Sequence, residues 1–222
     1  MSLAAVLLDL DGTLVDTAPD LVAVLNLLLR ESDRPRMPYA VARNEVSNGA
    51  GGLLRLGLGK TGGSADEVER LRPRFLEIYA GHIADGSRLF IGLDHLDDIG
   101  SRFELGVVTN KPDAFTKPLL AALDLTPRFG TVVSGDRLLQ RKPDPAPLKL
   151  AASELGLPAS RCVYVGDAPR DIEAGRAAGM ATIAAAYGYI RPSEDPHAWG
   201  ADAVIRRPND LGAALAALGS AA

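Results

Sequence analysis

The chain has 222 residues, of which 47% are hydrophobic and 23% are charged, and its formal net charge at pH 7 is -4. This is the composition of an ordinary globular protein that can bury a sizeable core, and the length suits one large domain or one domain with an insertion. The acidic balance, together with the lack of a dense basic stripe, argues against nucleic acid as the main partner.

The single cysteine, Cys162, excludes an internal disulfide and favours an intracellular setting. The first residues lack the basic stretch and long apolar segment of a signal peptide, and no apolar run approaches the roughly 20 residues of a membrane span. We therefore expect a cytoplasmic protein that does not associate with membranes. The sequence leaves the oligomeric state open.

The chain opens with an apolar run, Ala4–Leu8, that predicts one buried strand. Thr17–Asp20, with a capping threonine and an early proline, then predicts the start of a helix. The pattern stays helical to about residue 84, apart from glycine-rich turns at 47–52 and 59–64. Pro73 is expected to kink or divide the last helical pattern of this stretch.

From Phe90 onward, predicted strands alternate with predicted helices, which favours a parallel sheet covered on both faces. The predicted strands are 103–109, 131–134, 162–165, 181–184 and 203–205. The predicted helices are 94–101, 112–123, 146–155, 170–178 and 208–218. The expected fold is therefore an α/β, Rossmann-like core domain of residues 1–14 and 90–222. A small helical domain, residues 15–89, is inserted after the first strand.

Two aspartates, Asp9 and Asp11, follow the first predicted strand and are followed at once by Gly12. Residues i and i+2 of an extended backbone project to the same side, so the two carboxylates would lie close together. Such a pair requires a proton or a nearby cation. Taken alone, the pattern is equally typical of an Asp-rich turn after a strand.

Further polar residues follow later strands, and a parallel sheet would bring them all to the edge where ligands bind. They lie in the stretches 109–111, 140–145 and 166–171. Mg²⁺ takes oxygen ligands, which Asp9, Asp11 and Asp167 could supply, and a carboxylate can also act as a nucleophile. Thr109 and Lys142 could bind phosphoryl oxygens. Each residue alone has an ordinary structural explanation, but their combination at strand ends favours phosphoryl transfer.

Four stretches along the chain resemble the motifs of the haloacid dehalogenase superfamily. They are DLDGTLVD at 9–16, TN at 109–110, RKPDP at 141–145 and VGDAPRDIEAGRAAG at 165–179. The resemblance implies a phosphatase of this fold, whose inserted helical domain is similar to the superfamily's small helical cap.

The resemblance also implies a role for each motif residue. Asp9 would be the phosphorylated nucleophile and Asp11 the general acid and base. Thr109 and Lys142 would bind and stabilise the transferring phosphoryl group. The implied ligands of Mg²⁺ are the Asp9 carboxylate, the Asp11 backbone carbonyl and Asp167, with Asp171 in support.

Within the superfamily, the chain resembles phosphatases of small phosphorylated sugar acids and carboxylic acids. The resemblance rests on DTAPD at 16–20, SNGAGG at 47–52, VVTNKPDAF at 107–115, YGYI at 187–190 and DPHAWGAD at 195–202. It implies N-acetylmuramic acid 6-phosphate, an intermediate of peptidoglycan recycling, as the substrate. The alternative substrate is 2-phosphoglycolate. Two other functions stay open: a phosphoryl transferase of the β-phosphoglucomutase kind, and a binding module with an inactive site.

The expected partner is thus a small phosphate monoester, and both candidate acids carry a carboxylate as well as the ester. The predicted substrate-binding residues are Thr109, Asn110, Lys142, Asn48, Gly49 and Arg55. Arg55 is the candidate partner of the carboxylate.

Overall fold

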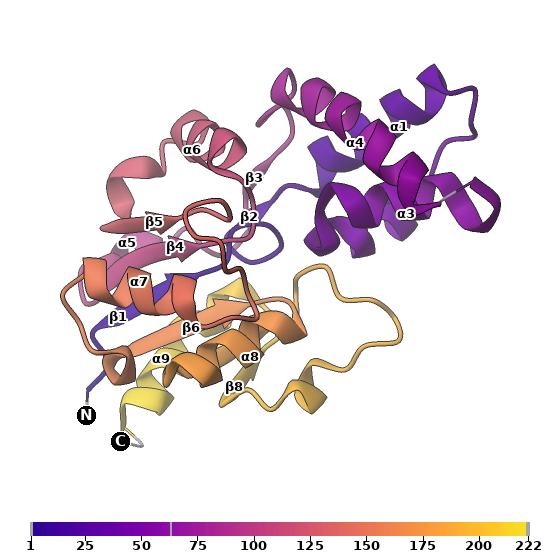
Figure 1. The fold of residues 1–222 in the computed structure, drawn as a ribbon. Helices are drawn as coiled ribbons and strands as arrows, with labels where there is room; N and C mark the ends of the chain where they lie inside the picture. Colours follow the sequence, from indigo (N-terminus) through magenta and orange to yellow (C-terminus); the bar gives the residue numbers. More distant parts are fainter. Residues whose placement is uncertain (1, 63, 221–222) are drawn as a thin grey trace.

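The protein is described here by a computed structural model that covers residues 2–62 and 64–220. Its main sheet has six parallel strands in the order β5-β4-β1-β6-β7-β8 (Figure 1). The strands are β1 (Ala5–Leu8), β4 (Glu104–Val108), β5 (Thr131–Val133), β6 (Cys162–Gly166), β7 (Ala181–Ala185) and β8 (Ala203–Ile205). The predicted α/β class with a parallel sheet is confirmed.

Helices cover both faces of this sheet, as Figure 1 shows for α7 and α8 in front and α9 behind. Val6 and Leu8 of β1 pack with apolar residues of α5, α6 and α9, whereas Leu7 packs with those of α7 and α8. Because both faces of β1 are buried, its sequence is continuously apolar. These helices are α5 (Leu96–Gly100), α6 (Asp113–Ala122), α7 (Ala146–Glu154), α8 (Pro169–Ala178) and α9 (Leu211–Ser220). Short 3₁₀ turns are η2 (Thr126–Arg128), η3 (Ala159–Arg161), η4 (Pro196–Trp199) and η5 (Pro208–Asp210).

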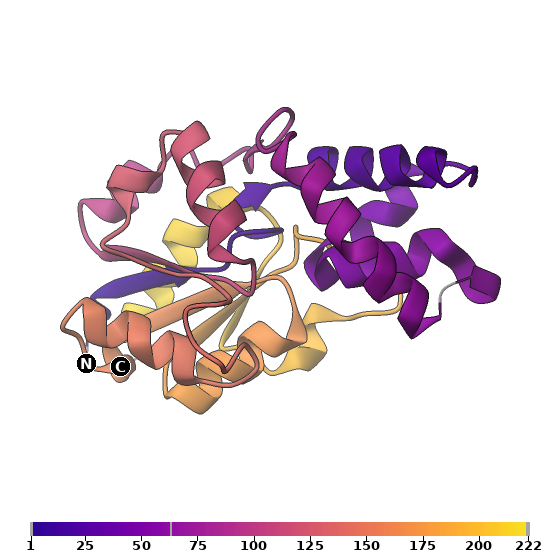
Figure 2. The ribbon, with the colours of Figure 1, turned by 45° about the horizontal axis from the view of Figure 1, so that its top comes forward.

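Between β1 and β4 the chain forms a helical segment, residues 17–84, that lies beyond the ends of the strands in both views (Figures 1 and 2). Its elements are α1 (Ala18–Glu31), α2 (Tyr39–Ala42), η1 (Arg43–Asn48), α3 (Gly49–Gly62) and α4 (Ala65–Ala80). Its apolar side chains form a core cluster distinct from those of the sheet. Among the helices that the structure describes, none is long and apolar enough to cross a membrane.

A short antiparallel ribbon marks the two places where the chain passes between the sheet and the helical segment. It pairs β2 (Val15–Asp16) with β3 (Arg88–Leu89). The ribbon was not predicted, because strands of two residues carry no recognisable hydrophobic pattern. The division into domains at residues 15 and 89 stays a prediction.

The glycine-rich stretch 47–52 is not the predicted turn, because α3 begins at Gly49 and continues to Gly62 with a kink at Gly59. The leucines that follow, Leu53, Leu54 and Leu58, are buried in the core of the helical segment. Burial of this apolar face outweighs the low helix propensity of the glycines. One position of the predicted second turn, residue 63, lies outside the described residues.

Helix α4 passes through Pro73 without the predicted division. Pro73 lacks the N–H that would bond to the Glu69 carbonyl. Both residues lie on the exposed side of the helix, where water can bond to that carbonyl instead. The loss of one hydrogen bond on this side is therefore tolerated.

The start of α1 is held by a side chain from the far end of the chain. Buried Tyr189 accepts hydrogen bonds through its hydroxyl from the backbone N–H groups of Thr17 (2.7 Å) and Ala18 (2.9 Å). The same hydroxyl lies 2.9 Å from Oδ1 of Asp16, to which it donates. Tyr189 therefore links the loop after β7 to the first turn of the helical segment.

We expect Tyr189→Phe to lower the free energy of unfolding by about 1–3 kcal/mol, because two buried N–H groups lose their acceptor. Urea denaturation measures this loss. Tyr39→Phe is the matched control, since Tyr39 is 45% exposed, and it should change stability by less than about 0.5 kcal/mol. Equal losses in the two variants would contradict this account of Tyr189.

Candidate active site

The parallel register brings the ends of three strands to the same level. Leu8 at the end of β1 lies opposite Val107 of β4 and Val165 of β6. The residues that follow the three strands, among them Asp9 and Asp167, therefore meet at one edge of the sheet. The helical segment lies against this edge.

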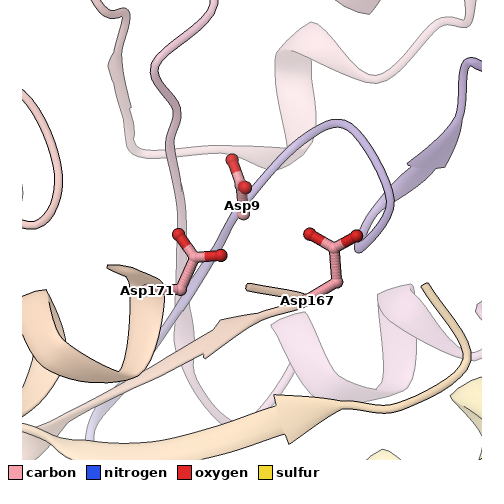
Figure 3. Close-up of side chains that lie close together, drawn as sticks. All are labelled: Asp9, Asp167 and Asp171. Carbon is pink, nitrogen blue, oxygen red and sulfur yellow. The ribbon is translucent and has the colours of Figure 1, made fainter. Parts of the chain in front are cut away.

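Three buried carboxylates gather here: Asp9 after β1, Asp167 after β6 and Asp171 in the first turn of α8 (Figure 3). Each offers an oxygen that lies within 4.8 Å of the others. Burial first, and then the negative charges of Asp171 and Asp9, raise the pKa of Asp167 to about 7. Oδ1 of Asp167 is buried and has no hydrogen-bond partner among the described residues. An unpaired oxygen in such a cluster fits a cation ligand.

The ammonium group of Lys142 lies inside this cluster. Its Nζ is 2.9 Å from Oδ1 of Asp9 and 2.8 Å from Oδ1 of Asp171. It donates a hydrogen bond to the Tyr164 hydroxyl (2.6 Å), which in turn donates to the Val108 carbonyl (2.7 Å). Burial raises the pKa of the Asp171 carboxyl, although Lys142 acts in the opposite direction. One ammonium does not balance three carboxylates, so the donor set suits a divalent cation with a preference for oxygen.

Asn110 holds the backbone of Lys142 in place. Its side chain donates to the Lys142 carbonyl (3.0 Å) and accepts from the Lys142 N–H (3.0 Å). Both ends of the amide are thus used inside the protein. In this arrangement Asn110 positions the lysine, and its predicted contact with substrate stays a prediction.

The Asp11 carboxylate is not a member of the acidic cluster. It accepts hydrogen bonds from Nζ of Lys111 (3.0 and 3.2 Å) and from Oγ1 of Thr17 (2.7 Å). A metal contact through the backbone carbonyl of Asp11 stays a prediction. This geometry leaves the carboxylate beside the cavity, where a general acid would be needed.

Sequence reasoning assigned no role to Lys111, although it directly follows the strand-end pair Thr109–Asn110. Burial lowers the pKa of Lys111, but Asp11 and Tyr79 raise it by more, so its pKa lies above the ordinary value. Its Nζ lies 4.7 Å from the centre of the Tyr79 ring, a cation–π contact with α4. Lys111 therefore joins the general-acid candidate to the helical segment.

Ser47 is a second residue that sequence reasoning missed. Its hydroxyl donates to Oδ2 of Asp167 (2.7 Å), and its carbonyl accepts from the Arg170 guanidinium (2.7 Å). The only available signal was its place directly before Asn48 and Gly49, which were predicted to face the site. Through Ser47, the helical segment reaches a candidate metal ligand.

Gly12 allows the loop after β1 to pack on Asp167. Its φ of 85° is a conformation that other residues rarely adopt, and a Cβ at this position would overlap Oδ2 of Asp167. The glycine of the first motif is thus required by space as well as by backbone conformation.

A cavity of about 370 Å³ lies between the sheet edge and the helical segment. Seven of the residues predicted to act in catalysis or in binding line its wall: Asp9, Asp11, Thr109, Asn110, Asn48, Gly49 and Arg55. Thr109 is buried, and its Oγ1 accepts a hydrogen bond from the Lys111 N–H (3.2 Å). The Asn48 side chain donates to Oε2 of Glu45 (3.1 Å). Residues predicted from separate parts of the chain therefore share one cavity.

A model of haloacid dehalogenase-like hydrolases matches residues 6–185 of the chain. The chain belongs to this family. It is 42% identical to an N-acetylmuramic acid 6-phosphate phosphatase of Pseudomonas aeruginosa, over 95% of this chain and 94% of that protein. It is 40% identical to a phosphoglycolate phosphatase of Xanthomonas campestris, over 93% of this chain and 94% of that protein.

A crystal structure of a predicted phosphoglycolate phosphatase from Haemophilus somnus superposes with a TM-score of 0.84 at 27% identity. The match covers 96% of this chain and 98% of that chain. With its relatives and its acidic site, the chain is a phosphatase of the haloacid dehalogenase-like family.

The raised pKa of Asp167 predicts a pH dependence in metal-free buffer. Its folded pKa of about 7 lies above the ordinary value of 3.8, so the folded state holds a proton that the unfolded state releases. The stability of the wild type relative to Asp167→Asn should therefore fall by a few kcal/mol as the pH rises from about 4 to 7. Urea denaturation with a chelator measures this difference at each pH.

The exposed variant Asp98→Asn controls for the loss of one negative charge. The stability difference between the wild type and Asp167→Asn could instead stay constant from pH 4 to 7. That result would contradict the explanation that burial and neighbouring charges raise the pKa of Asp167.

Proposed function

We propose that the protein is a Mg²⁺-dependent phosphomonoesterase that acts through an aspartyl-phosphate on Asp9. The observation that carries the proposal is the position of Asp9. It is buried in the acidic cluster and paired with Lys142, yet it also lines the cavity. A carboxylate oxygen at this place can reach a phosphorus atom whose oxygens are held by positive charge.

In the first step, an oxygen of Asp9 bonds to phosphorus, and the ester P–O bond breaks. Asp11 gives its proton to the departing alkoxide. In the second step, Asp11 takes a proton from water, the water oxygen attacks phosphorus, and the Asp9–phosphate bond breaks to release inorganic phosphate. Asp9 returns to its starting form.

Other side chains of the site hold the phosphoryl group. Buried Thr109 and Lys142 can donate to phosphoryl oxygens, and Asp171 keeps Lys142 in place at 2.8 Å. When bound, Mg²⁺ would neutralise the phosphoryl oxygens, with Asp9 and Asp167 as its side-chain ligands. The unpaired oxygen of Asp167 supports this assignment.

We propose N-acetylmuramic acid 6-phosphate, an intermediate of peptidoglycan recycling, as the substrate. The cavity of about 370 Å³ has apolar wall residues, including Leu21, Val46, Phe75 and Phe115, which suit a substituted sugar ring. The name of the Pseudomonas aeruginosa relative agrees with this choice. A location in the cytoplasm is part of the same proposal.

The alternative substrate is 2-phosphoglycolate, which the name of the Xanthomonas campestris relative favours. This acid is much smaller than the sugar phosphate and would leave most of the cavity to water. Basic side chains outnumber acidic ones on the cavity wall. This excess suits both candidate substrates, since each carries a phosphate dianion and a carboxylate.

Asp9→Asn should lower kcat for phosphate release by roughly 10³-fold or more, because the amide cannot form the covalent intermediate. Colorimetric phosphate release from N-acetylmuramic acid 6-phosphate and from 2-phosphoglycolate, both with Mg²⁺, measures this loss. The exposed variant Asp98→Asn should retain wild-type activity. Comparable activity in Asp9→Asn and wild type would refute the nucleophile assignment.

Mg²⁺ should stabilise the wild type by about 2.7 kcal/mol when its concentration is 100 times its Kd. This corresponds to a rise of about 5–10 °C in the thermal midpoint of a chain of this size. Asp167→Asn should lose most of this shift, since it removes a buried ligand without removing Lys142. Differential scanning fluorimetry across a Mg²⁺ titration makes the comparison, and an equal shift in both proteins would place the cation elsewhere.

A further inference from the structure

Two arginines from different helices meet on the cavity wall, in the part formed by the helical segment. Arg55 belongs to α3 and Arg72 to α4, and both line the cavity together with Gly51. A methyl group placed on Gly51 would lie 2.9 Å from Nη2 of Arg72 and 3.5 Å from Nη1 of Arg55. The two guanidinium groups therefore crowd the same space above the first turn of α3.

This pair of cations has little compensating negative charge. Within residues 2–62 and 64–220, Arg55 has no ion-pair partner, and Arg72 pairs with Glu69 (3.1 Å), whose side chain is 65% exposed. Such an exposed pair contributes little free energy. Nε of Arg72 is buried and has no hydrogen-bond acceptor among the described residues. An acceptor supplied by a ligand would remove this cost and the repulsion between the two cations.

The arginine pair is separate from the groups that hold the phosphoryl group. Ser47 contacts Asp167 from the end of η1, whereas Gly51 lies in the first turn of α3, beyond the break in the backbone at Gly49 (φ 64°). Across the described residues, neither arginine forms an ion pair with Asp9 or Asp11, which pair with lysines instead. The arginines therefore face a different part of the substrate from its phosphate.

We propose that Arg55 and Arg72 together bind the carboxylate of the substrate and that Arg72 is a specificity residue. The proposal rests on the proposed function, in which the substrate is a phosphorylated acid. The planar donors of guanidinium groups match the two oxygens of a carboxylate. The start of α3 adds a favourable dipole at the same place. Arg55 was a candidate from sequence, whereas Arg72 and the close approach at Gly51 emerge only from the fold.

The test compares two esters that differ in the acid group. N-acetylglucosamine 6-phosphate has the same phosphorylated sugar as N-acetylmuramic acid 6-phosphate but lacks the lactyl carboxylate. Arg72→Gln should raise KM for N-acetylmuramic acid 6-phosphate, the acid, roughly 10- to 100-fold, with kcat little changed. For N-acetylglucosamine 6-phosphate, kcat/KM should change less than about twofold. Arg70→Gln on the same helix, 70% exposed and outside the cavity wall, should match the wild type with both esters.

Gly51→Ala is a second variant that keeps both arginines. Alanine favours a helix more than glycine does, so the thermal midpoint should stay the same or rise. Its methyl group would occupy the space between the guanidinium groups, so KM for the acid should rise as it does in Arg72→Gln. A stable Gly51→Ala protein with unchanged KM for the acid would overturn the inference.

The outcomes separate this inference from the proposed function. Carboxylate recognition is wrong if the wild type hydrolyses both sugar phosphates with the same kcat/KM. It is also wrong if Arg72→Gln lowers kcat/KM for both sugar phosphates to the same degree. In either case the phosphatase assignment stands. The comparison of 2-phosphoglycolate with ethyl phosphate applies the same test to the alternative substrate. If the wild type releases phosphate from none of these esters, the proposed function fails, and the inference fails with it.

Discussion

The site depends on the ion pairs that the Lys142 ammonium forms with Asp9 and Asp171, 2.9 and 2.8 Å away, in the interior of the protein. Three carboxylates would not remain charged together in this buried space without positive charge nearby. One lysine offsets only part of their charge. Burial first, and then the charges of Asp171 and Asp9, raise the pKa of Asp167. This imbalance of buried charge is what makes the cluster suited to a divalent cation, as the proposed function requires.

The surrounding structure holds this charged group in a fixed geometry through neutral contacts. Asn110 bonds to the Lys142 backbone, and the Tyr164 hydroxyl connects the ammonium to the β4 carbonyl of Val108. From the other side, Ser47 bonds to Asp167 and ties the helical segment to the cluster. These hydrogen bonds keep the charged side chains in position, because a buried charge that can move loses part of its stabilisation.

The two parts of the cavity wall differ in chemistry. The sheet edge supplies acidic residues with paired lysines, as phosphoryl transfer requires. The helical segment supplies apolar side chains and the two arginines Arg55 and Arg72. Because the helical segment is inserted where β1 ends, it lies directly over the sheet edge. Residues that select the substrate can therefore vary without disturbing those that carry out the reaction.

The sequence by itself determined the parallel sheet, its central apolar strand and the polar strand ends, because these follow from local hydrophobic periods and from short motifs such as DLDGTLVD. Only the tertiary structure decided that Gly49–Gly52 start a helix, since burial of the following leucines outweighs glycine's local preference. It alone also brought Ser47 to Asp167, 120 positions away, and Arg72 to Arg55. Side chains from distant segments meet through packing, and no periodicity or spacing within one segment encodes that contact.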